Sequence, residues 1–87
     1  MPRIEKKIVV KTKQGLHARP AAMFVQIANK YSSAIVVRRD EEEVNGKSIM
    51  GILMLGADKG CEIALAVDGQ DAESALMDLE AFLGKEE

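Results

Sequence analysis

The sequence predicts an α+β fold: a two-layer open-faced sandwich in which two long helices and one short helix cover one face of a four-stranded antiparallel sheet. Three observations predict this class. Strand-like and helix-like stretches follow one another in the order βαββαβα, which is typical of a sheet with helices on one side. Apolar residues make up 47% of the 87 residues, which is enough for one core. No linker divides the chain, so we expect a single domain, residues 1–87, with its chemistry on the surface.

The first strand and the first long helix are predicted from two different periods. Residues 4–11 combine β-branched residues with basic side chains on alternate positions, as in a strand. From Pro20 to about Lys30 the period becomes helical, and Ser32 and Ser33 end the element. Apolar residues fall on one face of this helix at Ala21, Phe24, Val25, Ala28 and Tyr31.

A hairpin follows. Residues 34–39 are strongly strand-like, and a short strand is expected near residues 43–45. The acidic run at residues 40–43 is either a partner patch or a solvated hairpin tip, and the usual behaviour of short charge runs favours the tip.

The second half contains a short helix, a strand and the clearest helix of the chain. Ser48 can cap a helix that runs through Leu55 and is closed by Gly56. Residues 61–67 form the next strand. Asp71 and Gly84 are sensible caps for the last helix. One apolar stripe runs along it: Ala72, Ala75, Leu76, Leu79, Phe82 and Leu83.

The composition argues against several classes of protein. A net charge of −2, from 12 basic and 14 acidic residues, does not favour nucleic-acid binding. The apolar stretches are too short for membrane insertion, and the N-terminus lacks the apolar region of a signal peptide. Cys61 is the only cysteine, which rules out an internal disulfide and a cysteine-based metal site and fits a reducing cytoplasm. We expect no metal and no cofactor.

The segment Gly-Leu-His-Ala-Arg-Pro contains His17, the only histidine of the chain. Gly15 gives the backbone freedom to turn sharply after the strand. Pro20 falls in the first turn of the helix, where a missing N–H is harmless. His17 is therefore expected at or beside the helix N-cap. Because Arg19 precedes a proline, it is expected in an irregular first turn.

A histidine in this position is suited to phosphoryl transfer. The amides of Ala18 and Arg19 and the helix dipole form a natural anion site, to which the Arg19 guanidinium adds donors. The helix N-terminus disfavours the imidazolium, so His17 should stay neutral and nucleophilic. The residues alone leave two alternatives open. One is an ordinary surface or capping histidine; the other is a metal ligand, which is disfavoured because no second histidine or cysteine partner exists.

Two segments resemble the HPr family, the histidine-containing phosphocarriers of the bacterial phosphoenolpyruvate-dependent sugar phosphotransferase system. Residues 15–21 resemble the family's active-site segment, and residues 47–56 resemble its regulatory serine and short helix. The resemblance implies that enzyme I phosphorylates His17 on Nδ1 and that the phosphoryl group then passes to IIA proteins or domains. It also implies that Arg19 contacts the phosphate. Such a protein is a cytoplasmic phosphocarrier, not an enzyme, and is expected to be a monomer.

The resemblance assigns Ser48 a regulatory role. In many bacteria, an HPr kinase/phosphorylase modifies the corresponding serine of the family member. A catabolite-control transcription factor is a further possible partner. An ordinary N-cap serine is the alternative from residue type alone. The presence of His17 distinguishes the chain from catabolite-repression paralogues in which this position is no longer histidine.

Departures from the family pattern leave the partners open. Charged residues 39–42 replace a common Asn-Gly turn, and Gln26 and Asn29 stand where several relatives have lysines. The alternative function is therefore a regulatory binding module, of the nitrogen-branch or catabolite-regulation type, that docks to enzymes or a transcription factor.

The short helix carries more apolar residues than one face can bury. Spacing favours Ile52 and Leu55 pointing inward and leaves Met54 undecided. The residues expected to be exposed, and to form a partner-docking surface beside His17, are Ile49, Met50 and Leu53. Overflow from a crowded small core is the alternative.

Overall fold

The computed structural model describes residues 3–85 and has the predicted element order. It contains four strands and three helices: β1 (Arg3–Val9), α1 (Ala18–Ala28), β2 (Ala34–Arg39), β3 (Glu42–Asn45), α2 (Ile49–Leu55), β4 (Glu62–Asp68) and α3 (Ala72–Leu83). No helix within residues 3–85 has the length and apolarity needed to cross a membrane.

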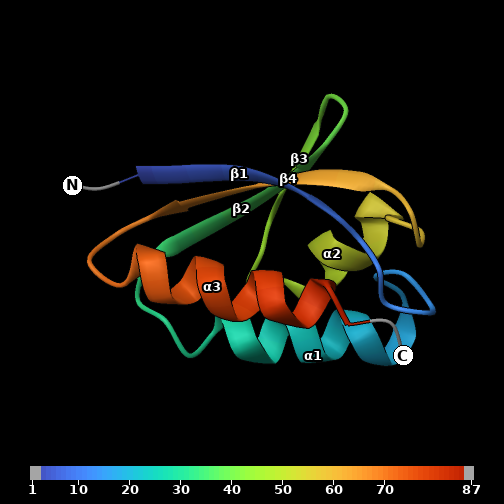
Figure 1. The fold of residues 1–87 in the computed structure, drawn as a ribbon, viewed down its shortest axis with the longest axis horizontal. Coiled ribbons are helices and arrows are strands. Elements are labelled where there is room, and N and C mark those ends of the chain that lie inside the picture. The colour runs from blue at the N-terminus through green and yellow to red at the C-terminus, as the bar shows by residue number, and fades with distance from the viewer. Residues whose placement is uncertain (1–2, 86–87) are drawn as a thin grey trace.

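The four strands form one antiparallel sheet in the order β1-β4-β2-β3. In β4, next to both β1 and β2, Ile63 lies opposite Ile8 and Leu65 lies opposite Val37. The helices lie on one side of this sheet (Figure 1). The predicted α+β two-layer sandwich is therefore confirmed.

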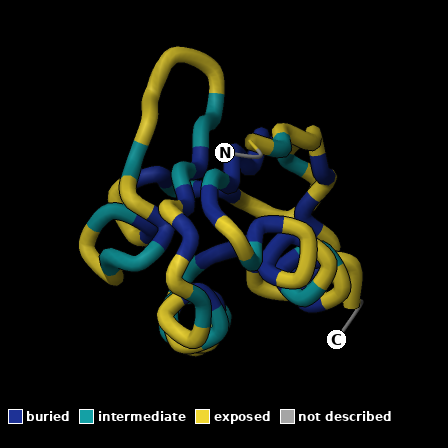
Figure 2. Tube along the Cα trace, turned by 90° about the vertical axis from the view of Figure 1, so that its left-hand side faces the viewer, coloured by how far each residue is buried: buried dark blue, intermediate teal, exposed yellow. Residues whose placement is uncertain are grey.

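The core lies between the sheet and the helices, where the buried segments gather in Figure 2. Every residue of the apolar stripe predicted for α3 is buried, and so are Ala21, Phe24 and Ala28 on α1. The tip between β2 and β3 is exposed, as expected for a solvated acidic turn (Figure 2).

The boundaries of α1 differ from the prediction. The helix begins at Ala18 and ends at Ala28, whereas the apolar spacing predicted Pro20 to about Lys30. At the end, both the backbone amide and the side-chain amide of Asn29 donate to the carbonyl of Val25, which closes the last turn.

The caps predicted for α3 are also different in detail. Asp71 occupies the N-cap position, but its carboxylate does not cap the helix. It accepts hydrogen bonds from Ser32 and Ser33 instead, because the buried Ser33 needs a polar partner there. Gly84 ends the helix with right-handed helical torsions, so no left-handed cap forms.

Candidate functional site

His17 is the N-cap residue of α1, as the sequence predicts. Its backbone is extended (φ −120°, ψ 159°), and its side chain makes no capping hydrogen bond. None of the turn and loop hydrogen bonds among residues 3–85 uses the amide of Ala18 or Arg19. The first turn of α1 therefore has backbone amides that can donate hydrogen bonds, and the imidazole beside them does not cap the helix. The irregular residue is Ala18, with φ 50°, rather than Arg19.

The loop before His17 is tightly built. The Thr12 hydroxyl donates to the Gly15 carbonyl at 2.8 Å, and the amide of buried Leu16 donates to the Ala57 carbonyl at 2.7 Å. Gly15 has φ +67°, and a Cβ at this position would lie 2.6 Å from the Ala57 oxygen. Glycine thus allows this loop to pack directly against the loop that follows α2.

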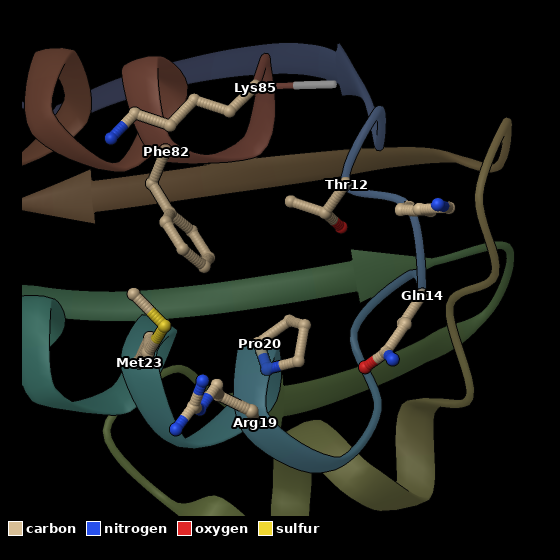
Figure 3. Close-up of a pocket in the computed structure, with 8 residues that line it drawn as sticks. Thr12, Gln14, Arg19, Pro20, Met23, Phe82 and Lys85 are labelled. Carbon is tan, nitrogen blue, oxygen red and sulfur yellow. The ribbon is translucent and has the colours of Figure 1, made fainter. Parts of the chain in front are cut away.

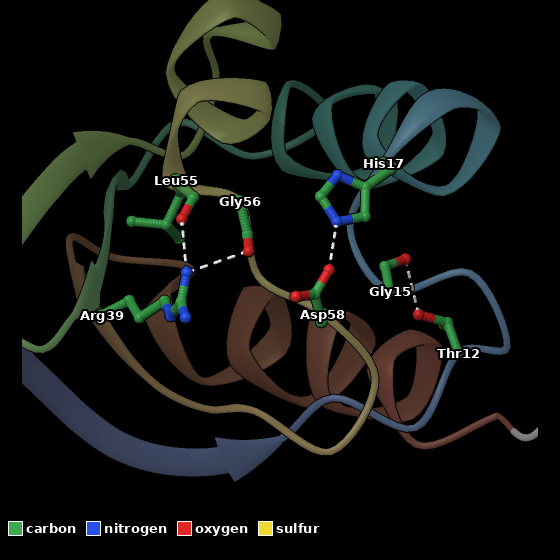
Figure 4. A network of polar contacts seen from close by, with 7 residues as sticks. All are labelled: Thr12, Gly15, His17, Arg39, Leu55, Gly56 and Asp58. Carbon is green, nitrogen blue, oxygen red and sulfur yellow. Dashed lines mark hydrogen bonds and ion pairs between the residues drawn. The ribbon is translucent and has the colours of Figure 1, made fainter.

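That second loop supplies the partner of the histidine. The Nε2 of His17 lies 2.7 Å from Oδ1 of Asp58, as Figure 4 shows. The two side chains are 41% and 77% exposed, so the pair lies at the surface within reach of another protein. Asp58 was not predicted from the sequence, because the contact joins positions 41 residues apart in the chain and has no local pattern.

Arg39 fixes the end of α2 from which this loop begins. Its Nη1 donates to the carbonyls of Leu55, at 3.1 Å, and Gly56, at 2.9 Å (Figure 4). Gly56 adopts the left-handed conformation that ends the helix. Arg39 was not singled out from the sequence either, since a strand arginine gives no local indication that it caps a distant helix.

Arg19 is exposed and lines a shallow hollow of about 290 Å³ between the start of α1 and the end of α3. Pro20, Met23 and Phe82 supply apolar surface, and Lys13 and Lys85 are further cations in its lining. Figure 3 labels Lys85 among these residues. Within residues 3–85, no ion pair involves Arg19, and no hydrogen bond joins it to His17. Arg19 follows His17 by two positions in the chain, but no hydrogen bond joins their side chains in the structure.

Ser48 caps α2 as the sequence predicts. Its backbone is extended, and its hydroxyl accepts a hydrogen bond from the Gly51 amide at 3.1 Å. The residue is only partly buried, so the hydroxyl lies near the surface at a helix start.

The predicted distribution of apolar side chains on α2 is confirmed. Ile52 and Leu55 are buried. The exposed group comprises Ile49 at 39%, Met50 at 63%, Leu53 at 39% and Met54 at 73%, so Met54 belongs with it. α2 packs against α1, and the loop after α2 carries the residue that contacts His17. The use of this surface in docking stays a prediction.

Comparisons with known proteins match the chain over nearly its whole length. A family model described as the PTS HPr component phosphorylation site matches residues 4–85. The HPr-like protein Crh of Halalkalibacterium halodurans is 47% identical over 83 residues, covering 95% of this chain and 99% of that protein.

Two solved structures extend the comparison. The phosphocarrier protein HPr from Bacillus anthracis strain Ames is 44% identical with a TM-score of 0.91, covering 93% of this chain and 96% of that chain. The HPr dimer from Thermoanaerobacter tengcongensis is 49% identical with a TM-score of 0.72, covering 90% and 94%. The percentage identity to the proteins named HPr is close to that to the protein named Crh. Overall similarity alone therefore does not separate these two kinds of relative.

Proposed function

The chain belongs to the HPr family of phosphocarrier proteins, and from this premise we propose that His17 accepts a phosphoryl group from enzyme I and passes it to IIA proteins or domains of sugar transport complexes. A protein of this kind forms a transient phosphohistidine and does not turn over a small molecule by itself, so it is not an enzyme. The observation that carries the proposal is the half-exposed imidazole at the uncapped start of α1.

The arrangement of the ring favours Nδ1 as the phosphoryl acceptor. Asp58 lies 2.7 Å from Nε2, which as a donor keeps its proton. A neutral ring protonated on Nε2 has its lone pair on Nδ1. That nitrogen can attack phosphorus without first losing a proton.

The start of α1 supplies the groups that receive the phosphoryl oxygens. The amides of Ala18 and Arg19 and the positive end of the helix dipole attract an anion. The Arg19 guanidinium adds a planar fork of donors, and because it is exposed it can turn toward the phosphoryl group.

Incubation with phosphoenolpyruvate and enzyme I, followed by intact-mass measurement, tests the proposal. The parent protein should gain one acid-labile phosphate, and His17→Ala should gain none while keeping its circular-dichroism spectrum. A parent protein that stays unmodified, or a His17→Ala variant that still gains acid-labile phosphate, would contradict the carrier function.

We also propose that the exposed apolar surface of α2 docks the partner proteins. The surface comprises Ile49, Met50, Leu53 and Met54, and such a cluster on a small protein commonly marks a partner site. Met50→Asp should raise the KM for this protein in phosphorylation by enzyme I. Met77→Asp is the matched control, because Met77 on α3 is 65% exposed and lies outside this surface. Equal KM values for both variants would argue against docking on α2.

Ser48 is proposed as a regulatory phosphorylation site for an HPr kinase/phosphorylase, with a catabolite-control transcription factor as reader. A phosphoserine dianion at a helix start is locally stabilised, so modification need not unfold α2. The added charge beside the exposed apolar surface should weaken docking. Ser48→Asp should therefore slow phosphorylation by enzyme I, and unchanged rates would support a purely capping serine.

A second candidate function is favoured by the 47% identity to a protein named Crh. In it, the chain is a regulatory module, of the catabolite or nitrogen branch, that docks to enzymes or a transcription factor. Acid-labile phosphate that moves on to a IIA protein supports the sugar carrier. Phosphate that stays on this chain, together with binding to a regulatory target, supports the module.

We propose that the protein works as a cytoplasmic monomer. A single cysteine fits a reducing compartment, and the proposed partners must reach the surface around His17. Because one HPr structure is described as a dimer, the oligomeric state needs its own measurement. Light scattering coupled to size exclusion should give the mass of one chain, and twice that mass would contradict the proposal.

A further inference from the structure

The second loop of the site contains a carboxylate with no evident structural task. Asp58 is 77% exposed at its side chain, and within residues 3–85 that side chain contacts only Nε2 of His17 among hydrogen-bonding and ion-pairing groups. Its backbone serves the fold separately, because its carbonyl accepts from the Cys61 amide at 3.0 Å. The side chain can therefore be removed without breaking the loop.

We propose that Asp58 is a positioning residue for phosphoryl transfer: it holds the His17 ring with Nε2 protonated and Nδ1 outward, and it stabilises the positive charge that the ring acquires. This inference rests on the proposed phosphocarrier function and deepens it. It assigns to one carboxylate both the choice of acceptor nitrogen and part of the stabilisation of the phosphorylated state.

Contacts between the two loops hold His17 and Asp58 at a fixed position relative to each other. The amide of Leu16, next to His17, donates to the carbonyl of Ala57, next to Asp58, at 2.7 Å. Both Leu16 and Ala57 have no exposed surface. On the other side, Arg39 holds the end of α2 through two carbonyls. The buried contact between Leu16 and Ala57 thus fixes the two backbones relative to each other, while the side chains of His17 and Asp58 reach solvent.

The charge balance explains what a carboxylate does here. The lone pair of Nδ1 forms a bond to phosphorus, and the bond from phosphorus to the donor's nitrogen breaks with its electron pair staying on the donor. Nε2 keeps its proton throughout, so the imidazole ring becomes cationic. The Asp58 carboxylate faces that proton and offsets the charge, as an aspartate does for the imidazolium of a hydrolase triad.

Ring nitrogen NMR tests the positioning directly, without any partner protein. His17 is the only histidine, so protein labelled with 15N-histidine gives only this ring's signals. At a pH where the ring is neutral, the parent should show a protonated Nε2 and an unprotonated Nδ1. In Asp58→Ala the shifts should move toward the averaged tautomers of an unconstrained ring. In Asp58→Asn they should stay near the parent values, because the amide oxygen still accepts from Nε2–H.

Phosphorylation kinetics test the charge. In Asp58→Ala, the rate of phosphoryl acceptance from enzyme I and the equilibrium ratio of phosphorylated to unphosphorylated protein should both fall by about threefold to fivefold, the upper range for an exposed ion pair. Asp58→Asn should lie between this variant and the parent. Glu41→Ala is the matched control: it removes one exposed carboxylate at the hairpin tip and should change neither quantity.

The outcomes separate this inference from the function on which it rests. Unchanged nitrogen shifts and rates in Asp58→Ala would overturn the positioning role while leaving phosphorylation of His17 intact. An equal loss of rate in Glu41→Ala would also overturn the positioning role, because the overall charge of the protein would then be changing its docking to enzyme I. A parent protein that enzyme I does not phosphorylate would refute the carrier function, and the charge-stabilising part of this inference with it.

Discussion

The starts of α1 and α3 are similar in their N-cap residues but differ in the partners that these residues have. Both N-cap residues leave their own helix uncapped by a side chain. At α3, the Asp71 carboxylate turns to a neighbouring turn and accepts from both the amides and the hydroxyls of Ser32 and Ser33. At α1, His17 has one exposed partner, Asp58, and the adjacent amides stay outside the loop hydrogen-bond network.

The difference separates a helix start that serves the fold from one that we propose to be reactive. The hydrogen bond from the Ser33 hydroxyl, followed by that from the Ser32 amide, is the main cause that lowers the pKa of Asp71 from 3.8 to about 2. Nearby, the hydroxyl of Tyr31 donates to Asp78 at 2.6 Å, and this bond raises the pKa of the phenol. Polar groups at the α3 start are thus committed to one another. Those at the α1 start remain available for a phosphoryl group.

The largest expected effect comes from breaking the α3 start. Gly69 has φ +153°, and a Cβ there would lie 2.7 Å from the Cα of Ser33. Gly69→Ala should lower the free energy of unfolding by about 3 kcal/mol, measured by urea denaturation. Gly60→Ala is the control, because its φ is also positive but no atom lies within 4 Å of the added Cβ. An equal loss in both variants would show that backbone strain, not the close approach to Ser33, sets the cost.

Asp71→Asn should lower the melting temperature at neutral pH by a few degrees without changing phosphorylation of His17. The pKa of Asp71 is lower in the folded protein than its ordinary 3.8. Its contribution is therefore complete above about pH 4 and is lost as the pH falls through about 2. The parent should lose stability over this range, and the difference between parent and variant should shrink. A difference that is constant with pH would contradict this assignment.

At the α1 start, Arg19→Ala should slow phosphoryl acceptance by about tenfold to a hundredfold, the range for losing a charge-assisted hydrogen bond. Its free energy of unfolding should change by less than about 0.5 kcal/mol, because the side chain is exposed. Lys85→Ala, which removes another cation lining the same hollow, should leave the rate unchanged. Equal slowing in both variants would mean that Arg19 acts only through the local positive charge and not by binding the phosphoryl group.

The smallest effect concerns the third helix start, which is capped in the ordinary way. Ser48→Ala removes the acceptor of the Gly51 amide and should cost about 1 kcal/mol of stability. Phosphorylation of His17 by enzyme I should proceed at the parent rate. A large loss of rate would mean that the Ser48 hydroxyl itself takes part in docking.

What could be predicted from the sequence was local. The buried stripe of α3 follows from helical spacing, and the positions of His17 and Ser48 at helix starts follow from the residues beside them. Two partners, Asp58 and Arg39, were missed because each contact joins separate elements.

Tertiary contacts also overrode one local rule. Asp71 fits the pattern of a capping residue, yet the carboxylate goes to Ser33, which is buried and has no other side-chain partner among residues 3–85. Capping preferences describe what an isolated helix start needs. They do not include a competing donor from another turn.

The most direct test of the proposal that the α1 start accepts the phosphoryl group is to locate the phosphate. Protein labelled with 15N-histidine is phosphorylated by enzyme I and phosphoenolpyruvate, and the one-bond 31P–15N coupling identifies the nitrogen that holds phosphorus. The expected result is a coupling to Nδ1 of His17, with Nε2 still protonated. A coupling to Nε2, or phosphate found on Ser48 instead, would contradict the account.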